Sequence, residues 1–385
     1  MKTALYWPFL IMMLWLLAGC GAATPAASTL APATPTPPTV PPPTATAIAT
    51  TTAPPPVPTA TSLPAATATA PASRAAGWAP INAVNSGPSP RYDQSALVDP
   101  VRQQLVVFGG RGNGTFGDTW ILDFATRQWR EVKGLGPAPR FGQAVVYDAA
   151  HRRMLLVMGE GANFFNDVWA FDLDKETWAS ISASAVADNK PRPRYGQSAA
   201  LDGKGRVIIS HVFSDQGRFD DTWAFDSSTA QWSNLTPASG PKPLRRCLHE
   251  LVYDSIADRV LMFGGCSSGF GPCPQGDLWA FDLKSNTWSE LKPSGPAPTA
   301  RSNPSMIYDA AGKRMVLFGG KTEGGASAEL WSYDLSANRW VTLGGAGPGA
   351  RSSQSASYDA KNGRVVIFGG QVSGNASADI WEYRF

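Results

Sequence analysis

The stretch Arg140-Phe-Gly-Gln-Ala-Val-Val-Tyr-Asp148 decides the fold, because variants of it recur through most of the chain. Its alternating pattern predicts a strand with one buried face. Recurrence at a fixed period, here about 50 residues, is the signature of a repeat architecture. Each variant follows a Pro-containing turn and opens with an arginine, which gives six repeats: Arg91, Arg140, Arg194, Arg246, Arg301 and Arg351, with the repeats starting near residues 88, 137, 191, 241, 296 and 348.

Every repeat continues in the same order. After a short turn, an apolar run ends in Phe-Gly-Gly in four repeats, at 108–110, 263–265, 318–320 and 368–370. The second repeat has Val157-Met-Gly-Glu160 instead, and the third has Ser210-His-Val-Phe213. A variable loop then leads to an acidic residue two positions before a tryptophan: Asp118/Trp120, Asp167/Trp169, Asp221/Trp223, Asp277/Trp279, Glu329/Trp331 and Asp379/Trp381.

A second tryptophan follows nine residues later in five repeats, at 129, 178, 232, 288 and 340. The last repeat lacks it, because the sequence ends at Phe385. Trp78, which precedes the first repeat, stands at the spacing that the missing residue would have. We therefore expect the segment around Trp78 to supply the outermost strand of the last repeat, which would pair an otherwise open sheet edge.

Four strands per unit, Gly pairs and paired aromatic residues resemble the kelch repeat over residues 75–385. The resemblance implies an all-β, six-bladed kelch-type β-propeller closed by an N-terminal strand. The tryptophans are then interpreted as packing between blades rather than as cofactor ligands.

Residues 1–19 have the features of an export signal. Lys2 precedes an apolar run from Leu5 to Leu17, which is too short for a membrane-spanning helix. The ending Leu17-Ala18-Gly19-Cys20 resembles the bacterial lipobox, which implies lipidation of Cys20. Several acyl chains would hold the protein on the bacterial cell membrane, facing the extracytoplasmic side. An ordinary secretory signal with an incidental cysteine is the alternative.

Residues 20–74 contain the lipidated cysteine and a linker rich in Pro, Thr and Ala. From Gly21 to Arg74 no residue is acidic or aromatic, so the segment cannot bury enough apolar surface to fold. It is predicted to be a disordered spacer that holds the propeller away from a membrane.

Composition argues against several classes of partner. Lys+Arg 33 against Asp+Glu 30 gives a net charge of +3, whereas nucleic-acid binding needs clustered basic residues. Three histidines offer little to a metal centre. We therefore expect no nucleic acid, no metal and no cofactor.

The arginines that open the repeats are predicted to lie near the channel mouth. Six of them there would attract carboxylate, sulfate or phosphate groups, because guanidinium matches these anions with two hydrogen bonds. Arginines at corresponding positions contact the ligand in some kelch proteins that bind acidic peptides; Arg140 and Arg194 match best, and Arg91, Arg246, Arg301 and Arg351 less closely. The alternative is an ion pair within each repeat, between the arginine and the acid before the first tryptophan.

Loops on the same face carry aromatic residues in repeats one to four. Exposed rings beside polar loops can stack on sugars or anchor a peptide. They can equally fold back onto their own blades. The candidates are Phe116, Phe164, Phe165, Phe219 and Phe270.

Three cysteines remain after Cys20, all in the fourth repeat. Export implies an oxidising setting, in which a disulfide is expected. Cys266 with Cys273 would close the loop between them, while Cys247 is an alternative partner for Cys266. Their spacing does not suit a zinc site.

The enzymatic alternatives have less support. The copper-radical chemistry of galactose oxidase, a kelch propeller, needs paired His and Tyr ligands with a crosslinked Cys, and three scattered histidines do not provide that arrangement. N-acetylneuraminate epimerases are six-bladed kelch proteins that act on an anionic sugar, and they fit the size of this chain and its arginine-rich mouth. Epimerisation, however, needs a well-placed general base, and no acid is expected to stand apart from the repeat pattern. We therefore predict a monomeric, lipid-anchored, non-catalytic recognition module for an extracellular glycan or protein segment. A sugar-modifying enzyme of the epimerase type is the alternative, and a purely structural envelope protein is a third possibility.

Overall fold

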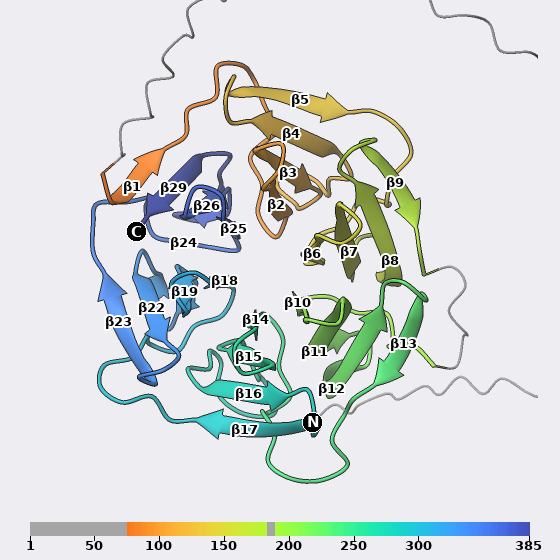
Figure 1. Ribbon diagram of the computed structural model, residues 1–385, viewed down its shortest axis with the longest axis vertical. Coiled ribbons are helices and arrows are strands. Elements are labelled where there is room, and N and C mark those ends of the chain that lie inside the picture. The colour runs from red at the N-terminus through yellow and green to blue at the C-terminus, as the bar shows by residue number, and fades with distance from the viewer. Residues whose placement is uncertain (1–74, 183–188) are drawn as a thin grey trace, which may run out of the picture. The chain divides into compact units, whose positions relative to one another are not determined.

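The computed structural model describes residues 75–182 and 189–385, and its regular structure there is entirely β-strand, without a helix in either range. Six four-stranded antiparallel sheets and two smaller sheets make up the fold (Figure 1). The all-β class is therefore confirmed, and so are the four-stranded antiparallel sheets that the kelch resemblance implies. The predicted signal, Cys20 and the linker up to residue 74 lie outside the described residues.

Within each sheet the hydrogen-bonded strands follow one another in chain order, except that β1 (Gly77–Pro80) joins the sheet that contains the last strand; antiparallel neighbours can be joined by a short connection. We number the sheets in chain order. Sheet 1 contains β2 (Ser95–Asp99), β3 (Gln104–Phe108), β4 (Thr119–Asp123) and β5 (Gln128–Val132); sheet 2 contains β6 (Ala144–Asp148), β7 (Arg153–Glu160), β8 (Phe164–Asp172) and β9 (Thr177–Ser180); sheet 3 contains β10 (Ser198–Leu201), β11 (Arg206–Ser214), β12 (Gly217–Asp226) and β13 (Gln231–Asn234).

The remaining large sheets have the same plan. Two small sheets lie in loops of the last two repeats: β20 (Lys321–Thr322) with β21 (Gly325–Ala326), and β24 (Arg351–Ser352) with β27 (Gln371–Val372) and β28 (Asn375–Ala376). Sheet 4 contains β14 (Glu250–Asp254), β15 (Arg259–Phe263), β16 (Leu278–Asp282) and β17 (Thr287–Leu291); sheet 5 contains β18 (Ser305–Asp309), β19 (Arg314–Phe318), β22 (Leu330–Asp334) and β23 (Arg339–Leu343); sheet 6 contains β25 (Ser355–Asp359), β26 (Arg364–Phe368), β29 (Ile380–Arg384) and β1 (Gly77–Pro80).

Sheet 6 is built from both ends of the described region. β1 pairs antiparallel with β29, and Trp78 lies opposite Tyr383. The segment around Trp78 thus occupies the outer position of the last sheet, next to the final strand of the chain (Figure 1).

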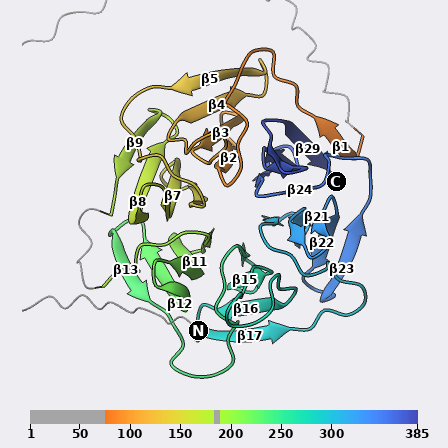
Figure 2. The ribbon, with the colours of Figure 1, turned by 180° about the vertical axis from the view of Figure 1, so that it is seen from behind.

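The first strands of the six sheets lie around a common centre (Figure 1, Figure 2). Each neighbours the next in chain order, and β25 neighbours β2. In each repeat, the residue two positions before the first strand donates its backbone N–H to the carbonyl of the equivalent residue in the preceding repeat, at 2.7 to 3.0 Å. We call these six residues the backbone ring: Asp93, Gly142, Gly196, Leu248, Asn303 and Ser353.

Every member of the backbone ring has a positive φ, between 50° and 67°. Glycine adopts this conformation without a steric penalty, whereas a residue with a Cβ is disfavoured there. Four of the six positions nevertheless carry a side chain, so the continuous ring of hydrogen bonds outweighs the local strain at those positions.

The hydrophobic core lies between neighbouring sheets. One cluster joins Val106 and Phe108 of sheet 1 to Leu156 and Phe171 of sheet 2. Outer-strand tryptophans contact the preceding sheet: Trp178 packs on Phe108 at 5.1 Å between ring centroids, Trp129 on Phe368, Trp340 on Phe263 and Trp78 on Phe318.

Candidate functional site

The arginines that open the repeats are buried side chains, none more than 2% exposed. Each forms an ion pair with the acid of its own repeat. Five pairs are bidentate, with N···O distances from 2.5 to 2.9 Å, and Arg301 reaches Glu329 through one contact of 2.5 Å. The pairs are Arg91–Asp118, Arg140–Asp167, Arg194–Asp221, Arg246–Asp277, Arg301–Glu329 and Arg351–Asp379.

The tryptophan of each repeat completes this unit. In the first repeat, Trp120 Nε1 donates to Asp118 Oδ2 at 2.7 Å, and Arg91 Nε donates to the Ser89 carbonyl at 2.9 Å. Burial raises the pKa of Asp118, but the Arg91 guanidinium and Trp120 outweigh it and hold this pKa below its ordinary value. Of the two sequence-based alternatives, the geometry favours the intra-repeat ion pair.

The arginines are therefore not brought together as one anion site. Each guanidinium has its donors directed at groups of its own repeat, including carbonyls such as that of Gly109 for Arg91, at 3.0 Å. Ligand contact by these six side chains would require exposed donors, and burial removes that exposure. We leave them out of the functional site.

The predicted aromatic residues differ in their surroundings. The Arg91 guanidinium carbon lies 4.3 Å from the ring centroid of Phe116, and that of Arg140 lies 3.8 Å from Phe165. These two rings fold back onto the ion pairs, as the structural alternative expected. Phe164 stacks on Tyr195 at 5.7 Å, Phe219 pairs with Val212 within sheet 3, and Phe270 is half exposed beside Arg245.

One face of the fold brings the variable loops to the first strands. In every repeat, the residue after the arginine pairs antiparallel with the residue that follows the Gly pair or its equivalent. We call this end of the molecule the loop face; its pairs are Tyr92/Arg111, Phe141/Glu160, Tyr195/Phe213, Cys247/Cys266, Ser302/Lys321 and Ser352/Gln371.

A pocket of about 570 Å³ opens on the loop face. Arg111 forms an ion pair with Asp93 at 2.8 Å, while Lys321 and Glu323, which come from the fifth repeat, are exposed. We call this the mouth pocket; it is lined by Asp93, Arg111, Tyr195, Leu248, Cys266, Cys273, Pro274, Ser302, Asn303, Lys321, Thr322, Glu323, Ser352, Ser353 and Gln371.

A smaller cavity of about 160 Å³ follows the first strands of all six sheets. We call it the channel. Four glutamines on its wall donate Nε2 to a carbonyl of the preceding sheet, at 2.8 to 3.2 Å, and so link the sheets: Gln94 to Phe368, Gln143 to Phe108, Gln197 to Val157 and Gln354 to Phe318.

One carboxyl lies in this channel. Glu250, at the start of β14, is the single ionisable residue in the described channel wall. Ser198 Oγ donates to Glu250 Oε2 at 2.9 Å. Burial raises the pKa of Glu250 to about 8, and the Ser198 hydrogen bond opposes this only in part.

Comparison with known families identifies the repeat. A family model described as the KLHDC2/KLHL20/DRC7 Kelch-repeats domain matches residues 72–265 and 253–385. The chain belongs to this kelch-repeat family.

Several kelch-type relatives are similar over part of the chain. Kelch repeat-containing protein 2 of Saccharomyces cerevisiae is 26% identical over 39% of this chain and 18% of its own length. Dynein regulatory complex subunit 7 of Chlamydomonas reinhardtii is 30% identical over 36% of this chain and 12% of its own. Human host cell factor 1 is 26% identical over 64% of this chain and 12% of its own. The chain thus spans less than a fifth of the length of these relatives.

Comparing the kelch repeats with one another makes Glu250 an exception. The residue four positions after each arginine is Ser95, Ala144, Ser198, Glu250, Ser305 or Ser355. The expectation that no acid stands apart from the repeat pattern is therefore wrong. The signal was present in the sequence, because the other five repeats have a small, uncharged residue at this position.

Two histidines lie behind the channel wall of the third and fourth kelch repeats. His249 takes the position of the glutamines, and His211 lies 6.0 Å from it between ring centroids. Burial, together with the positive charge of Arg246, lowers the pKa of His211 to about 4 and that of His249 well below its ordinary value. Both rings are therefore neutral at pH 7.

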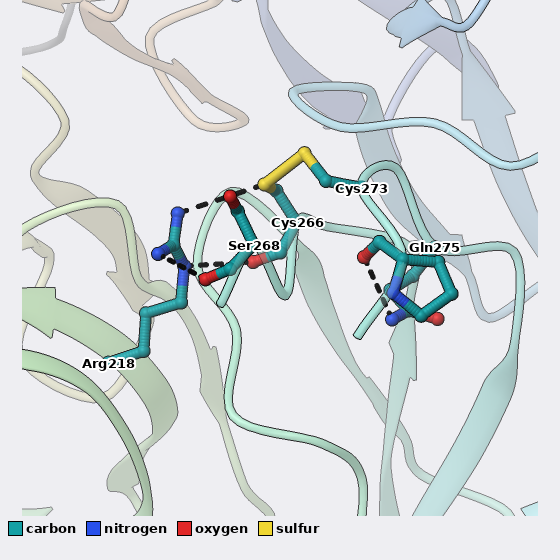
Figure 3. The surroundings of a disulfide bond; sticks show 6 residues. Arg218, Cys266, Ser268, Cys273 and Gln275 are labelled. Carbon is teal, nitrogen blue, oxygen red and sulfur yellow. Dashed lines mark hydrogen bonds between the residues drawn. A yellow bond between two sulfur atoms is a disulfide. The ribbon is translucent and has the colours of Figure 1, made fainter. Parts of the chain in front are cut away.

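The fourth kelch repeat contains a disulfide between Cys266 and Cys273, whereas Cys247 is a buried free thiol. Arg218 Nη1 donates to the Ser268 carbonyl at 2.8 Å, and Nη2 lies 3.7 Å from Cys266 Sγ (Figure 3). The disulfide and Arg218 together fix the loop that borders the mouth pocket.

Neither a metal cluster nor a membrane span is found in the described part of the chain. Residues 75–182 and 189–385 contain no group of three or more His, Cys, Asp or Glu arranged to hold a metal ion. In these ranges, no helix is long and apolar enough to cross a membrane.

Proposed function

We propose that this kelch protein is a non-catalytic recognition module that binds an extracellular protein segment in the mouth pocket. The observation that carries the proposal is the pocket itself, about 570 Å³ in volume and open on the loop face. Binding sites for small ligands commonly have volumes of about 300–1,000 Å³.

The scaffold of the proposed site is a six-bladed propeller. We infer that sheets 1 to 6 are its blades and that β1 closes the ring. The backbone ring supports this, because Asp93 N–H donates to the Ser353 carbonyl at 3.0 Å and so joins the first sheet to the last. A closed ring would hold loops from distant repeats at fixed distances, which reduces the ordering cost of binding.

The charges of the mouth pocket indicate the kind of segment. Arg111 and Lys321 are basic, and Asp93 and Glu323 are acidic, so the pocket has no excess of one sign. Such a surface suits a polar peptide with side chains of both signs, since complementary charges favour one register over others.

We also propose the location that the N-terminal sequence favours. Cys20 would carry a lipid anchor in a bacterial cell membrane, and residues 21–74 would act as the spacer that presents a monomeric propeller outside the cytoplasm. Mass spectrometry of the protein from a bacterial membrane tests this: we expect an acylated N-terminal Cys20, and an unmodified Cys20 would contradict it.

Panning tests the recognition site. The full chain is immobilised and panned against a phage library of random peptides, with a glycan array probed in parallel. We expect enriched peptides whose binding falls about tenfold or more with Arg111→Ala or Lys321→Ala, the loss of one charge-assisted contact. Lys175→Ala, an exposed lysine paired with Asp172 in a turn of sheet 2, is the matched control and should bind normally.

Two outcomes would contradict the proposal. Enriched peptides that bind both mouth-pocket variants as well as the control would place the site elsewhere. Binding of glycans, without enrichment of any peptide, would assign the module to glycans, the other ligand class predicted from the sequence.

The channel offers little space for a sugar-modifying enzyme of the epimerase type. Glu250 is the one channel carboxyl with a raised pKa, as a general acid or base requires. Its cavity of about 160 Å³, however, is smaller than the roughly 300 Å³ of typical ligand pockets. Incubation with N-acetylneuraminate, followed by proton NMR of its anomers, should show no change in mutarotation rate.

A further inference from the structure

The three cysteines of the fourth repeat lie together beside the mouth pocket. Cys266 and Cys273 form the disulfide and line that pocket, while Cys247 is a free thiol in the fold's interior, 2% exposed. Cys247 stands directly opposite Cys266 in an antiparallel bridge. Its backbone N–H donates to the Cys266 carbonyl at 3.2 Å, and the Cys266 N–H donates to the Cys247 carbonyl at 2.8 Å. The free thiol is therefore a cross-strand neighbour of a residue that is already in a disulfide.

This backbone pairing brings Cys247 and Cys266 within the range of a disulfide bond. Residues that exchange both backbone hydrogen bonds have Cα atoms about 5.5 Å apart, and a disulfide spans about 4.4–6.8 Å between Cα atoms. Directly opposite residues of an antiparallel pair also place their side chains on the same face. Cys266 can therefore bond to Cys247 without a large shift of either backbone segment.

One guanidinium, that of Arg218, acts on both of these cysteines. Its Nη2 lies 3.7 Å from Cys266 Sγ (Figure 3). Burial raises the pKa of the Cys247 thiol, and the positive charge of Arg218 opposes that rise. A nearby arginine favours the thiolate, which is the form of cysteine that attacks a disulfide. Arg218 thus lies where it can support an attack of Cys247 on Cys266.

Cys273 differs from the other two cysteines, because it is exposed at the mouth pocket. Residues 268–273 are exposed throughout. Besides the disulfide, two hydrogen bonds hold the base of this loop: Ser267 N–H and Gln275 Nε2 both donate to the Pro272 carbonyl, at 3.1 and 3.0 Å. These bonds would keep Cys273 at the pocket after its disulfide opened.

We propose that the three cysteines form a thiol–disulfide exchange site, which frees Cys273 for modification by small disulfides at the mouth pocket. The Cys247 thiol gives its proton to solvent, and the thiolate attacks Cys266 Sγ to form a Cys247–Cys266 bond. The Cys266–Cys273 bond breaks, and its electron pair leaves on Cys273 Sγ. One disulfide replaces another, so this step needs no oxidant or reductant. The Cys273 thiolate then attacks a small disulfide, forms a mixed disulfide with one half and releases the other half as a thiolate.

Glutathione disulfide, added to the full chain without any reductant, tests the exchange. All proteins carry Cys20→Ser, so that only the cysteines of the fourth repeat are followed. Mass spectrometry of unreduced peptides maps the disulfides over about a day, since uncatalysed disulfide rearrangement takes minutes to hours. The key variant is Cys247→Ser, which installs the residue found at this position in repeats five and six and so should keep the fold. Cys273→Ser, which leaves Cys247 and Cys266 as the two thiols, tests whether these two can reach each other.

In the parent chain, we expect glutathione on Cys273 together with a Cys247–Cys266 disulfide. The Cys247→Ser protein should keep the original disulfide and carry at least about tenfold less glutathione on Cys273, because it lacks the attacking thiol. The Cys273→Ser protein should form the Cys247–Cys266 disulfide and retain no glutathione, since the second thiol displaces it.

Three results would overturn the proposal. The first is a parent chain whose Cys266–Cys273 bond persists throughout, with or without glutathione on Cys247. The second is equal modification of Cys273 in the parent chain and in Cys247→Ser, which would mean that an outside thiol opens the disulfide. The third is a Cys273→Ser protein without a Cys247–Cys266 bond. None of these results bears on peptide recognition in the mouth pocket, because the readout is the pattern of disulfides.

Discussion

At the scale of single residues, the fold depends on a charge unit repeated six times. Taking Arg140 and Asp167 out of water is costly, and the bidentate contact and the Trp169 hydrogen bond offset that cost only while both partners are present. The same unit explains why the sequence repeats an arginine, an acid and a tryptophan at matching distances. These side chains stabilise the scaffold, so recognition is left to residues that differ between repeats.

Removing one partner of such a pair should be severely destabilising. Arg140→Met leaves Asp167 without its counter-ion, and we expect the free energy of unfolding to fall by about 3–5 kcal/mol. Urea unfolding of the full chain measures this. Lys133→Met, which breaks the exposed pair with Glu131, should cost less than about 1 kcal/mol. Similar losses for the two variants would contradict a structural role for the buried pairs.

The raised pKa of Glu250 predicts a pH dependence of stability. Because the folded chain binds this proton up to a pKa of about 8, and the unfolded chain only up to about 4.3, stability should fall as pH rises between these values and then level off. Each unit of difference contributes about 1.4 kcal/mol. Glu250→Gln, which leaves the neighbouring side chains of His249 and Asp93 in place, should lack this decline. Parallel curves for both proteins would contradict the assignment.

At the scale of the strands, β1 joins the start of the described region to its end. Its four residues pair with β29, and Trp78 contacts both Tyr383 of the same sheet and Phe318 of sheet 5. The strand therefore contributes packing to two sheets as well as hydrogen bonds to one. Sequence spacing alone indicated this role for Trp78, because the last repeat lacks its second tryptophan.

Truncating this contact should destabilise the whole domain. We expect Trp78→Ala to lower the free energy of unfolding by about 3 kcal/mol, the cost of removing a large side chain that packs between sheets. Val341→Ala, on the exposed side of β23, should stay within about 0.5 kcal/mol of the native value. A Trp78→Ala protein as stable as the control would show that β1 does not help to hold the sheets together.

At the scale of the whole molecule, the repeat pattern made the architecture predictable. Hydrophobic alternation and the acid–tryptophan spacing are local signals that recur six times, and the Gly pair recurs four times, which leaves few other arrangements. The site was harder to predict, because arginine and acid lie on the same face and their pairing depends on distances between strands. Glu250 could have been found by comparing the repeats column by column. The mouth pocket could not, since the equivalent repeat positions that line it carry side chains of different size and charge, such as Arg111, Tyr195 and Lys321.

The most direct test of the proposed function is hydrogen–deuterium exchange of the full chain with and without the tightest peptide obtained by panning. Binding in the mouth pocket predicts slower exchange in residues 320–325 and 351–353, next to the exposed Lys321 and Glu323, with the outer strands β5, β9 and β13 unchanged. Protection confined to the outer strands, or no protection despite saturating peptide, would contradict recognition at the mouth pocket.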